Sequence, residues 1–513
     1  MFAPDRICAS IGAATADEAQ RLFRLAVNPP GRARAVELRL DYLRDEAERQ
    51  AFLKWLSRQR RLPTVIATCR PTGSGGRFAG NVESELAVLT QAVRCGCRWC
   101  DVGIETASQL KPAQLRHTLA PSRVMISAHD FERVPANVAK LLGGLQHHGG
   151  DAVKLAATCH DLADVRRLLP LAHGQQNRVV IPMGEAALPA RILALREGSA
   201  LAFASIGEAT APGQLSLEAL RKIYRLGGGQ RRRPLNLTRR TKVYGVIGDP
   251  IGHSLSPLLQ NTAFAAHGLD AIYLPFHVRD LRDFLAAVEP LGIAGFSVTL
   301  PHKESILRYL DECDPLAAEV GAVNTVAVRS GRLYGYNTDY VGVLRAIERR
   351  VPLPSSRVLL FGAGGSARSA AFALKQAGAD VVICARRPER ARALARAVRG
   401  ATVERSALSR ESFDVIVNCT PVGMYPNGGC PLKASELNCR AVMDLIYRPR
   451  KTELLRRAEQ MGITTISGVE MFLEQGFEQF EIWTGRRAPS AAMRRALTSA
   501  LDDEERASAP TGK

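Results

Sequence analysis

The stretch Val358-Leu-Leu-Phe-Gly-Ala-Gly-Gly-Ser-Ala-Arg-Ser-Ala370 decides the fold of the second half of the chain. A hydrophobic run ends in glycines, and small residues then lead into an amphipathic segment that ends near Gly378. In a dinucleotide-binding unit the first glycine makes a tight turn, the second admits a pyrophosphate, and a small third residue lets the helix pack on the strand. The pyrophosphate binds at the helix N-terminus. The residues predicted to form this site are Gly362, Ala363, Gly364, Gly365, Ser366 and Ala367.

The next apolar segment indicates which dinucleotide is bound. A glycine turn alone also fits a strand-to-helix turn in any parallel α/β sheet. Residues 380–384, however, lead into Arg386, Arg387 and Arg390, with no acidic residue where a ribose 2′-hydroxyl would be held. Guanidinium groups at this point suit a 2′-phosphate. The sequence therefore predicts NADP.

The length and the cysteine content of the chain limit the classes of protein to which it can belong. A chain of 513 residues is too long for one ordinary core and predicts two to four domains. Its eleven cysteines are an odd number in a chain too large to need disulfide staples, which indicates a reducing compartment. Cys95, Cys97 and Cys100 lack a fourth ligand at zinc-like spacing. We expect buried thiols there and no metal.

Hydropathy and charge exclude further classes. No apolar run reaches the roughly 18 residues of a membrane span, and the first residues lack the pattern of a signal peptide, so we expect a cytoplasmic protein without a membrane partner. The net charge of +19 could indicate nucleic-acid binding. The basic residues are scattered along the chain, which favours a solvated surface that attracts anionic substrates, without a nucleic-acid partner.

The first half alternates short apolar runs with helical stretches. Eight such runs are expected to be strands, at residues 7–11, 35–40, 64–69, 99–104, 124–127, 152–156, 179–182 and 201–206. Eight alternations predict a (β/α)8 barrel over residues 1–226, in which chemistry lies at the C-terminal ends of the strands. The charged residues expected there are Glu37, Arg39, Arg70, His129 and Lys154, with Arg191 in the loop region after the seventh strand.

Lys154 stands out because strand periodicity points it into the barrel. Burial lowers the pKa of an amine and makes it a nucleophile that forms an imine with a ketone or aldehyde. The alternative is a lysine that reaches the barrel rim or pairs with Glu37. His129 ends the preceding strand and could serve as general acid and base, although a lone histidine is usually structural.

These residues resemble type I 3-dehydroquinate dehydratase. The resemblance rests on Glu37-Leu-Arg39-Leu-Asp41, Thr68-Cys-Arg70, Ser127-Ala-His129-Asp130-Phe131, Lys154 and Ala211-Pro-Gly-Gln214. It implies an imine at Lys154, proton transfer by His129, a ring contact from Glu37, and no cofactor. Arg39, Arg70, Arg191, Thr210 and Gln214 are implied to hold the substrate carboxylate and hydroxyls. Ser74 replaces a glutamate that in many members pairs with the catalytic histidine, which predicts a slower dehydratase or another carboxylate in that role.

A basic, glycine-rich linker is expected at residues 227–242, followed by polar residues at the ends of short apolar segments. Ser254 and Ser256 precede Pro257, which also fits a helix N-cap. Thr299 and Lys303 flank a proline turn, and Asn324 and Asp339 end later segments. Each could be turn chemistry alone.

Their order resembles shikimate dehydrogenase, with further matches at Asn418-Cys-Thr420-Pro421-Val-Gly423-Met424, Asp444-Leu-Ile-Tyr447 and Gly468-Val-Glu-Met-Phe-Leu-Glu-Gln475. The resemblance implies a catalytic pair, Lys303 and Asp339, with Ser254 and Ser256 on the substrate carboxylate. Thr299, Asn324, Tyr447 and Gln475 are implied to hold ring hydroxyls, and Thr420 to contact the cofactor. We expect a substrate domain at 243–340 completed by 468–496, an NADP domain with a Rossmann-like fold at 341–467, and a tail at 497–513 that is frayed from Asp502 onward.

Together the two resemblances predict a bifunctional enzyme. The barrel would dehydrate 3-dehydroquinate to 3-dehydroshikimate, and the second half would reduce this product to shikimate with NADPH. Two alternatives stay open at this point. One is a catabolic enzyme acting on quinate, and the other is a regulator that binds these ligands without turnover.

Overall fold

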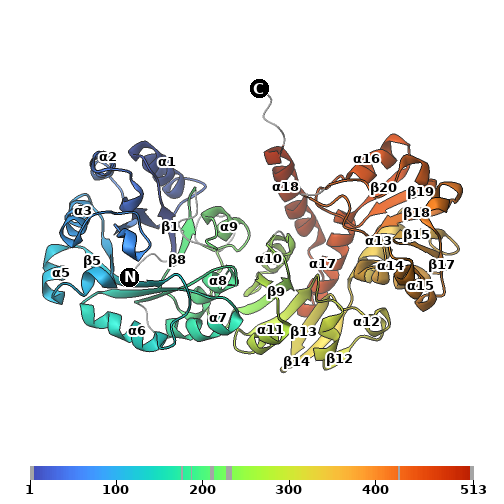
Figure 1. Ribbon diagram of the computed structural model, residues 1–513, viewed down its shortest axis with the longest axis horizontal. Coiled ribbons are helices and arrows are strands. Elements are labelled where there is room, and N and C mark those ends of the chain that lie inside the picture. Colours follow the sequence, from blue (N-terminus) through green and yellow to red (C-terminus); the bar gives the residue numbers. More distant parts are fainter. Residues whose placement is uncertain are drawn as a thin grey trace. The chain divides into compact units, whose positions relative to one another are not determined.

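The structure is a computed structural model, and it describes residues 5–174, 177–186, 188–207, 213–226, 234–252, 254–425 and 428–508. The chain divides into two compact units (Figure 1). The first comprises Met1–Val243 with Asp270–Gly292, and the second comprises Tyr244–Leu269 with Ile293–Lys513. Each unit is described by itself.

The first unit is built on eight parallel strands, as the sequence predicted. They are hydrogen-bonded in the order β7-β6-β5-β4-β3-β2-β1-β8, which makes a near-barrel. Their bounds are β1 Ile7–Ile11, β2 Ala35–Arg39, β3 Thr64–Thr68, β4 Trp99–Gly103, β5 Arg123–Asp130, β6 Ala152–Thr158, β7 Arg178–Met183 and β8 Ala202–Ser205. Their side chains are almost all buried, as expected where helices cover one face of a sheet and the other face closes on itself.

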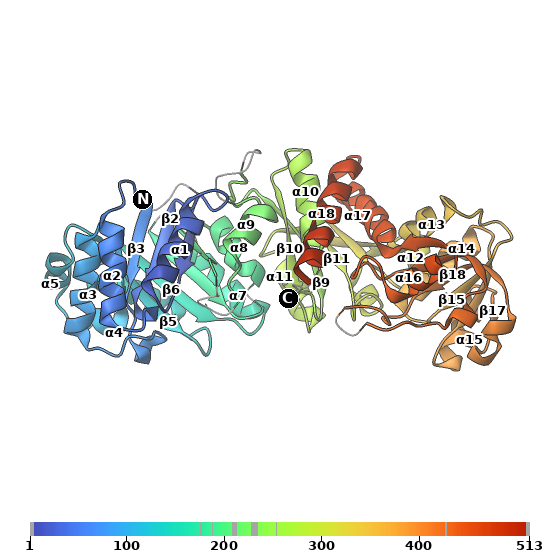
Figure 2. The same cartoon turned by 90° about the horizontal axis from the view of Figure 1, so that it is seen from above.

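Helices cover the outside of these strands (Figure 2). They are α1 Ala16–Val27, α2 Glu46–Ser57, α3 Val82–Arg94, α4 Ile104–Ala107, α5 Pro112–Thr118, α6 Val138–Leu145, α7 Leu162–Leu168, α8 Leu188–Glu197 and α9 Leu217–Lys222. Short polar side chains start several of them: Thr15, Asp45, Asn81, Asp161 and Ser216 each accept a backbone N–H of the first turn. The unit also contains β10 Ala271–His277 and α11 Leu281–Val288.

The second unit contains two sheets. In one, the strands follow the order β9-β11-β13-β14-β12, with bounds β9 Lys242–Gly248, β11 Ile293–Val298, β13 Thr325–Arg329, β14 Arg332–Tyr336 and β12 Glu312–Cys313. Strands β11, β13 and β14 pair antiparallel, whereas β12 is parallel to β14. The accompanying helices are α10 Ser256–Ala266, α12 Pro315–Val320, α17 Gly468–Thr484 and α18 Ser490–Ser508.

The other sheet is parallel and follows the order β17-β16-β15-β18-β19-β20. Its strands are β17 Ala401–Thr402, β16 Asp380–Cys384, β15 Arg357–Phe361, β18 Phe413–Asn418, β19 Cys439–Asp444 and β20 Thr464–Ser467. This is the doubly wound order in which ligands bind where the strand order reverses, between β15 and β18. Two apolar cores cover its faces, and the associated helices are α13 Asp339–Glu348, α14 Gly365–Gln376, α15 Pro388–Ala397 and α16 Glu453–Gln460. The predicted Rossmann-like fold is confirmed.

The prediction that the tail is frayed from Asp502 onward is wrong as far as Ser508, because helix α18 continues to that residue. Its side chains Leu497 and Leu501 are buried, and Asp502 binds Arg450 with 2.9 Å between carboxylate and guanidinium. The apolar stripe therefore outweighs the high charge of this segment. Among the helices that the structure describes, none combines the length and apolar character needed to cross a bilayer.

Candidate active sites

The barrel interior holds Lys154 between two carboxylates. Its Nζ lies 2.7 Å from Oδ2 of Asp101 and 3.5 Å from Oε1 of Glu37, and about 6% of its side chain is exposed. Glu37 in turn accepts hydrogen bonds from Ser10 at 2.6 Å and Thr68 at 3.0 Å. The pairing of Lys154 with Glu37, given as the alternative to a buried nucleophile, is therefore present together with burial.

Asp101 is the functional residue that the sequence analysis missed. It lies on β4, is 2% exposed, and binds Lys154, Arg70 at 3.0 Å and the Ser127 hydroxyl at 2.5 Å. Burial alone would raise the pKa of this carboxyl, but Lys154 and Arg70 hold it well below its usual range. The available signal was an acidic residue inside an otherwise apolar strand, because a charge is seldom buried without a partner.

His129 is the last residue but one of β5, the strand beside β6, which agrees with its predicted place near the end of that strand. Burial, followed by the charges of Arg70 and Lys154, lowers the pKa of His129 well below its ordinary value, so the imidazole is neutral near pH 7. Its Nδ1 is buried without a hydrogen-bond partner within the described ranges. A neutral imidazole beside an ammonium group is equipped to accept a proton.

Ser74 lies at the end of a short turn of 3-10 helix, Thr72–Ser74. The Phe131 ring stacks on His129 with 5.9 Å between ring centroids, and a Cβ added to Gly75 would lie 2.3 Å from that ring. The turn thus lies against Phe131, but no carboxylate in it replaces the glutamate of the relatives. Asp101 is the acidic group that raises the pKa of His129 within the described part of the chain, against the larger effects of burial and the two cations.

The predicted anion-binding residues have distinct surroundings. Arg70 keeps Nη1 without a hydrogen-bond partner among the described residues, while its Nη2 holds Asp101 and Ser127. Arg39 makes two hydrogen bonds to Asp41, at 2.9 and 2.7 Å. Arg191 lies on α8, which corrects the loop placement, and burial lowers its pKa to about 10. Gln214 is half-buried, and Thr210 lies outside the described residues.

In the second unit Lys303 and Asp339 form a close pair. Lys303 Nζ lies 2.5 Å from Oδ2 of Asp339, and their side chains are 14% and 8% exposed. Asp339 begins α13, while Lys303 follows β11 after the Leu300–Pro301 turn. Asn324 Nδ2 donates to Oδ1 of Asp339 at 2.8 Å and to Thr338 at 3.0 Å. The amide of Asn324 therefore orients the carboxylate, and its predicted substrate contact stays a prediction.

The other predicted substrate residues lie on different elements of the same unit. Ser254 Oγ accepts the N–H of Ser256 at 3.2 Å just before α10. The N-cap residue of α10 is Leu255, without a side-chain cap, so the alternative of a Ser254 or Ser256 N-cap is wrong, whereas Pro257 does lie in the first turn. Tyr447 stacks on Phe472 with 4.4 Å between ring centroids. Gln475 is buried on α17, and Thr299 is half-buried after β11. Their contacts with a substrate stay predictions.

The glycine turn fits a dinucleotide. Gly362 has a φ of +123°, and a Cβ there would lie 3.2 Å from Cys419 and from Thr420, so a side chain would be strained. Gly364 and Gly365 open α14 with no atom within 4 Å of an added Cβ, which leaves room at the helix N-terminus, and Ala367 is fully buried. Arg386, Arg387 and Arg390 are exposed at the end of β16 and make no ion pair within the described chain.

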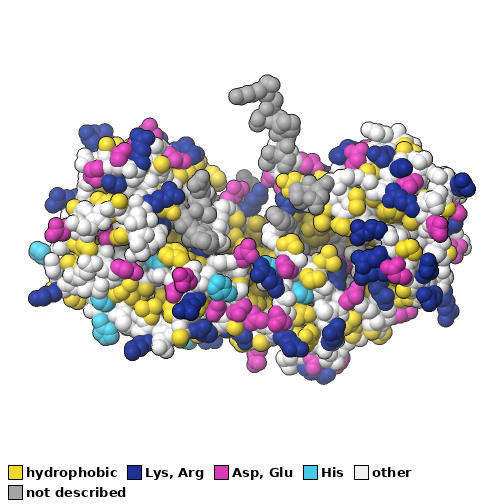
Figure 3. Space-filling model, viewed as in Figure 1, with side chains coloured by type: hydrophobic (Ala, Val, Ile, Leu, Met, Phe, Trp, Pro, Cys, Tyr) yellow, Lys and Arg dark blue, Asp and Glu magenta, His cyan; other side chains and the backbone are white. Residues whose placement is uncertain are grey.

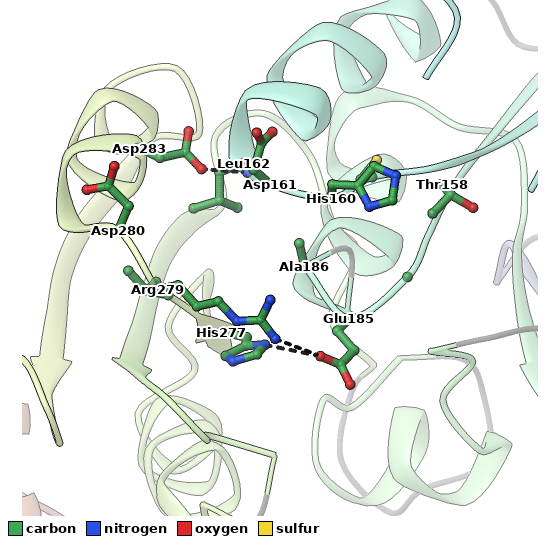
Figure 4. A pocket seen from close by; sticks show the side chains of 13 residues that line it. Thr158, His160, Asp161, Leu162, Glu185, Ala186, His277, Arg279, Asp280 and Asp283 are labelled. Carbon is green, nitrogen blue, oxygen red and sulfur yellow. Dashed lines mark hydrogen bonds and ion pairs between the residues drawn. The ribbon is translucent and has the colours of Figure 1, made fainter. Parts of the chain in front are cut away.

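A cavity of about 430 Å³ in the first unit lies away from these groups (Figure 4). Glu185 points toward His277 and Arg279, at 3.5 and 3.7 Å. The lining also includes Asp161, Asp280 and Asp283, and neither Lys154 nor His129 belongs to it. An acidic lining suits a carboxylate substrate poorly. The buried lysine clusters are therefore the better candidates for the chemistry.

The distribution of surface charge and the state of the cysteines can be compared with what the composition predicts. On the face shown in Figure 3, Lys and Arg side chains are interspersed with Asp and Glu. All eleven cysteines are free, and Cys97 and Cys100 are buried. Within the part of the chain that the structure describes, no group of three or more His, Cys, Asp or Glu side chains could hold a metal ion.

Three family models match separate segments of the chain. The model for type I 3-dehydroquinase matches residues 7–231, the shikimate dehydrogenase substrate binding domain matches 246–326, and the shikimate 5'-dehydrogenase C-terminal domain matches 468–498. The bifunctional 3-dehydroquinate dehydratase/shikimate dehydrogenase of Arabidopsis thaliana is 36% identical over 95% of this chain and 83% of its own length. The chain belongs to this bifunctional family.

Relatives of the second half are also found alone. The shikimate dehydrogenase (NADP(+)) of Methanothermobacter thermautotrophicus is 42% identical over 52% of this chain and 99% of its own length. A solved shikimate dehydrogenase in complex with NADP⁺ is 37% identical, with a TM-score of 0.48, and covers 51% of this chain and 96% of its own. Family membership makes the chain a bifunctional lyase and NADP-dependent oxidoreductase of the shikimate pathway.

Proposed function

We propose that Lys154 and His129 carry out the dehydration of 3-dehydroquinate, and that Lys303 and Asp339 carry out the reduction of 3-dehydroshikimate to shikimate. The observation that carries this proposal is the pair of lysine–carboxylate clusters, one in each unit. A lysine is seldom buried without a functional or structural partner. The two proposed reactions also follow one another, because the product of the barrel is the substrate of the second unit.

In the barrel, the Lys154 amine attacks the ketone after it passes its proton to neutral His129, which returns this proton to the oxygen that leaves. Water leaves and an imine forms, which can take up the electron pair of a neighbouring C–H bond. Neutral His129 removes that proton to give an enamine. The enamine then expels hydroxide, which leaves as water with the proton from His129, and hydrolysis of the imine restores Lys154.

Binding in the barrel rests on the arginines. Nη1 of Arg70 has no hydrogen-bond partner among the described residues and suits one oxygen of the substrate carboxylate, and Arg191 supplies a second buried cation. Arg39, Thr210 and Gln214 are proposed for the hydroxyls. Glu37 is proposed to face the ring, although its two oxygens already bind Ser10, Thr68 and Lys154.

In the second unit, Lys303 donates the proton that the substrate oxygen needs when the carbonyl is reduced. Asp339 holds the ammonium group, and Asn324 fixes the orientation of that carboxylate. Ser254 and Ser256 are proposed for the substrate carboxylate, with Thr299, Asn324, Tyr447 and Gln475 for the hydroxyls. A bound NADPH supplies the hydride.

The cofactor site is proposed at the strand-order reversal after β15. The open N-terminus of α14, at Gly364 and Gly365, suits the pyrophosphate. Arg386, Arg387 and Arg390 suit the 2′-phosphate because they are exposed. The remaining contacts are proposed for Gly362, Ala363, Ser366, Ala367 and Thr420.

We also propose a cytoplasmic location and small-molecule ligands without a nucleic-acid or membrane partner. The eleven free cysteines support a reducing compartment. Basic side chains interspersed with acidic ones support a solvated surface rather than a nucleic-acid footprint (Figure 3). The Arabidopsis relative is described as chloroplastic.

A steady-state assay of both half-reactions on the intact chain tests the proposal. We expect turnover of 3-dehydroquinate without added cofactor, and reduction of 3-dehydroshikimate with NADPH. We also expect kcat/KM for shikimate to exceed that for quinate in the reverse reaction. The double variant Arg386→Ala/Arg390→Ala should raise KM for NADPH roughly tenfold or more and leave the dehydratase unchanged. Equal KM values in parent and variant would remove these arginines from the site.

A further inference from the structure

A fully buried carboxylate, Asp444, lies outside the set of residues assigned above. It ends β19 and accepts three hydrogen bonds. Its Oδ1 accepts from Asn418 Nδ2 at 3.0 Å and from the Ile446 N–H at 3.1 Å, while its Oδ2 accepts from the Thr452 hydroxyl at 2.7 Å. An ionised carboxylate only accepts hydrogen bonds, so it holds donors that point to it from three separate segments.

The contact with Asn418 connects Asp444 to the proposed cofactor site. Because Asn418 turns its NH₂ group toward Asp444, its carbonyl oxygen faces Thr420. That oxygen accepts from the Thr420 N–H at 3.0 Å and from the Thr420 hydroxyl at 2.7 Å. Thr420 and Cys419 lie against Gly362, at 3.2 Å from an added Cβ. The carboxylate therefore fixes the loop that lies against the glycine turn.

The contact with the Ile446 N–H connects Asp444 to the proposed substrate site. The Ile446 N–H is bound by Asp444, and Tyr447 is the next residue. Tyr447 stacks on Phe472, and the Leu255 backbone hydrogen-bonds its side chain. Leu255 lies between Ser254 and Ser256, the residues proposed for the substrate carboxylate. A continuous set of contacts thus runs from Gly362 through Asp444 to Ser256.

Protonation offers a way to observe this network. Burial raises the pKa of Asp444 to about 6, although the bonds from Thr452, Ile446 and Asn418 lower it. The other titratable group that senses this charge in the described structure is the Cys419 thiol, whose pKa is raised by burial and then by Asp444. A protonated carboxyl becomes a donor and can no longer hold all three groups.

We propose that Asp444 is a positioning residue that sets the cofactor loop and the substrate tyrosine together, so that its loss weakens binding of NADPH and of 3-dehydroshikimate alike. The proposal rests on the roles proposed for Thr420 and Tyr447. It concerns binding geometry, and Asp444 itself touches neither ligand in this account.

The test compares Asp444→Asn with Asp414→Asn, a carboxylate near the start of the neighbouring strand β18, in the intact chain. We expect Asp444→Asn to raise KM for NADPH and for 3-dehydroshikimate roughly tenfold each, with an unchanged dehydratase. The fall of kcat/KM below about pH 6 should also disappear. Asp414→Asn should change neither KM.

A milder variant keeps the carboxylate in place. Thr452→Val removes one hydrogen bond that lowers the pKa of Asp444, so the acidic limb of kcat/KM should move to higher pH. A change in only one KM on Asp444→Asn, or an unmoved acidic limb in Thr452→Val, would overturn the proposal.

Two further variants separate this proposal from the site on which it rests. Thr420→Ala should raise mainly KM for NADPH, and Tyr447→Phe mainly KM for 3-dehydroshikimate. If Thr420→Ala leaves KM for NADPH unchanged and Tyr447→Phe leaves KM for 3-dehydroshikimate unchanged, the assigned ligand contacts are wrong. If both behave as expected and Asp444→Asn moves only one KM, the contacts stand and the coupling through Asp444 is wrong.

Discussion

Both lysine clusters place a lysine beside carboxylates, yet the mechanisms proposed for them require opposite protonation states of that lysine. Lys154 must become neutral to attack a ketone, although it lies between Asp101 and Glu37. Lys303 must stay charged to donate a proton, and it has one carboxylate partner, Asp339. A buried ion pair alone therefore does not define the chemistry of a lysine.

The difference lies in the neighbouring groups. In the barrel, His129 is neutral and lies on the strand next to Lys154, so a proton acceptor is at hand. The two carboxylates there are also shared with Arg70, Ser10 and Thr68. In the second unit, Asp339 is oriented by Asn324, and this arrangement keeps the carboxylate aimed at Lys303. The same pairing thus serves a nucleophile in one site and an acid in the other.

The largest effect is expected for Lys154→Met. Without the amine no imine forms, so dehydratase kcat/KM should fall by on the order of 10⁴-fold or more, while the dehydrogenase is unchanged. Steady-state assays of both reactions measure this, with Lys140→Met on the exposed side of α6 as the control. Substantial dehydration by the Lys154 variant would remove the covalent step from the account.

The complementary change is Lys303→Ala. We expect dehydrogenase kcat to fall by roughly 10²- to 10⁴-fold, because the general acid is lost, while NADPH binding stays intact. Turnover assays and NADPH titration measure the two quantities, and Lys375→Ala on α14 serves as the control. Near-normal turnover would show that the two lysines do not have comparable importance.

A smaller effect is expected for Ser74→Glu, which adds the carboxylate found in many relatives. A carboxylate near His129 would favour the charged imidazole and raise its depressed pKa, and it could accept a hydrogen bond from Nδ1. Dehydratase kcat/KM should rise by a few fold, with its acidic limb moved to higher pH. Ser74→Gln is the matched neutral control. Identical profiles for the two variants would show that position 74 does not act on His129.

The smallest effect concerns Glu85, a buried carboxyl on α3 that accepts from the Thr106 hydroxyl at 2.7 Å. Burial raises its pKa to about 7. The folded chain therefore prefers the protonated form, and this contribution to stability is complete below about pH 4.5 and is lost as pH rises through 7.

Glu85→Gln removes this dependence on pH. At pH 8 the variant should unfold at a higher temperature than the parent, by an equivalent of about 1–2 kcal/mol, and the two should converge near pH 5. Thermal unfolding at both pH values measures the difference. A variant that is less stable at both would indicate that the glutamate is held as an anion.

Much of the fold followed from periodicity. The eight barrel strands and the glycine turn at Gly362 were predicted because apolar runs and turn residues act locally. Lys154 was found for the same reason, since a single charge interrupts an apolar strand. Asp101 carries a similar signal, but its partners come from β5, from β6 and from Arg70 just after β3, and this arrangement is a property of the assembled barrel.

Other features depended on contacts that sequence alone does not specify. Helix α18 continues past the expected end because Leu497 and Leu501 find a buried surface. Asp444 was noted only as part of a motif, since its three donors lie at positions 418, 446 and 452. The role of Asn324 as a partner of Asp339 likewise becomes evident only when both side chains are placed.

The central claim is that Lys154 is the nucleophile of one site and Lys303 is not a nucleophile in the other. Borohydride reduction of the intact chain with 3-dehydroquinate, followed by peptide mass spectrometry, tests it directly. The account predicts a covalent adduct on the peptide that contains Lys154 and none on the peptide that contains Lys303. Absence of an adduct at Lys154, or its appearance at Lys303, would contradict the account.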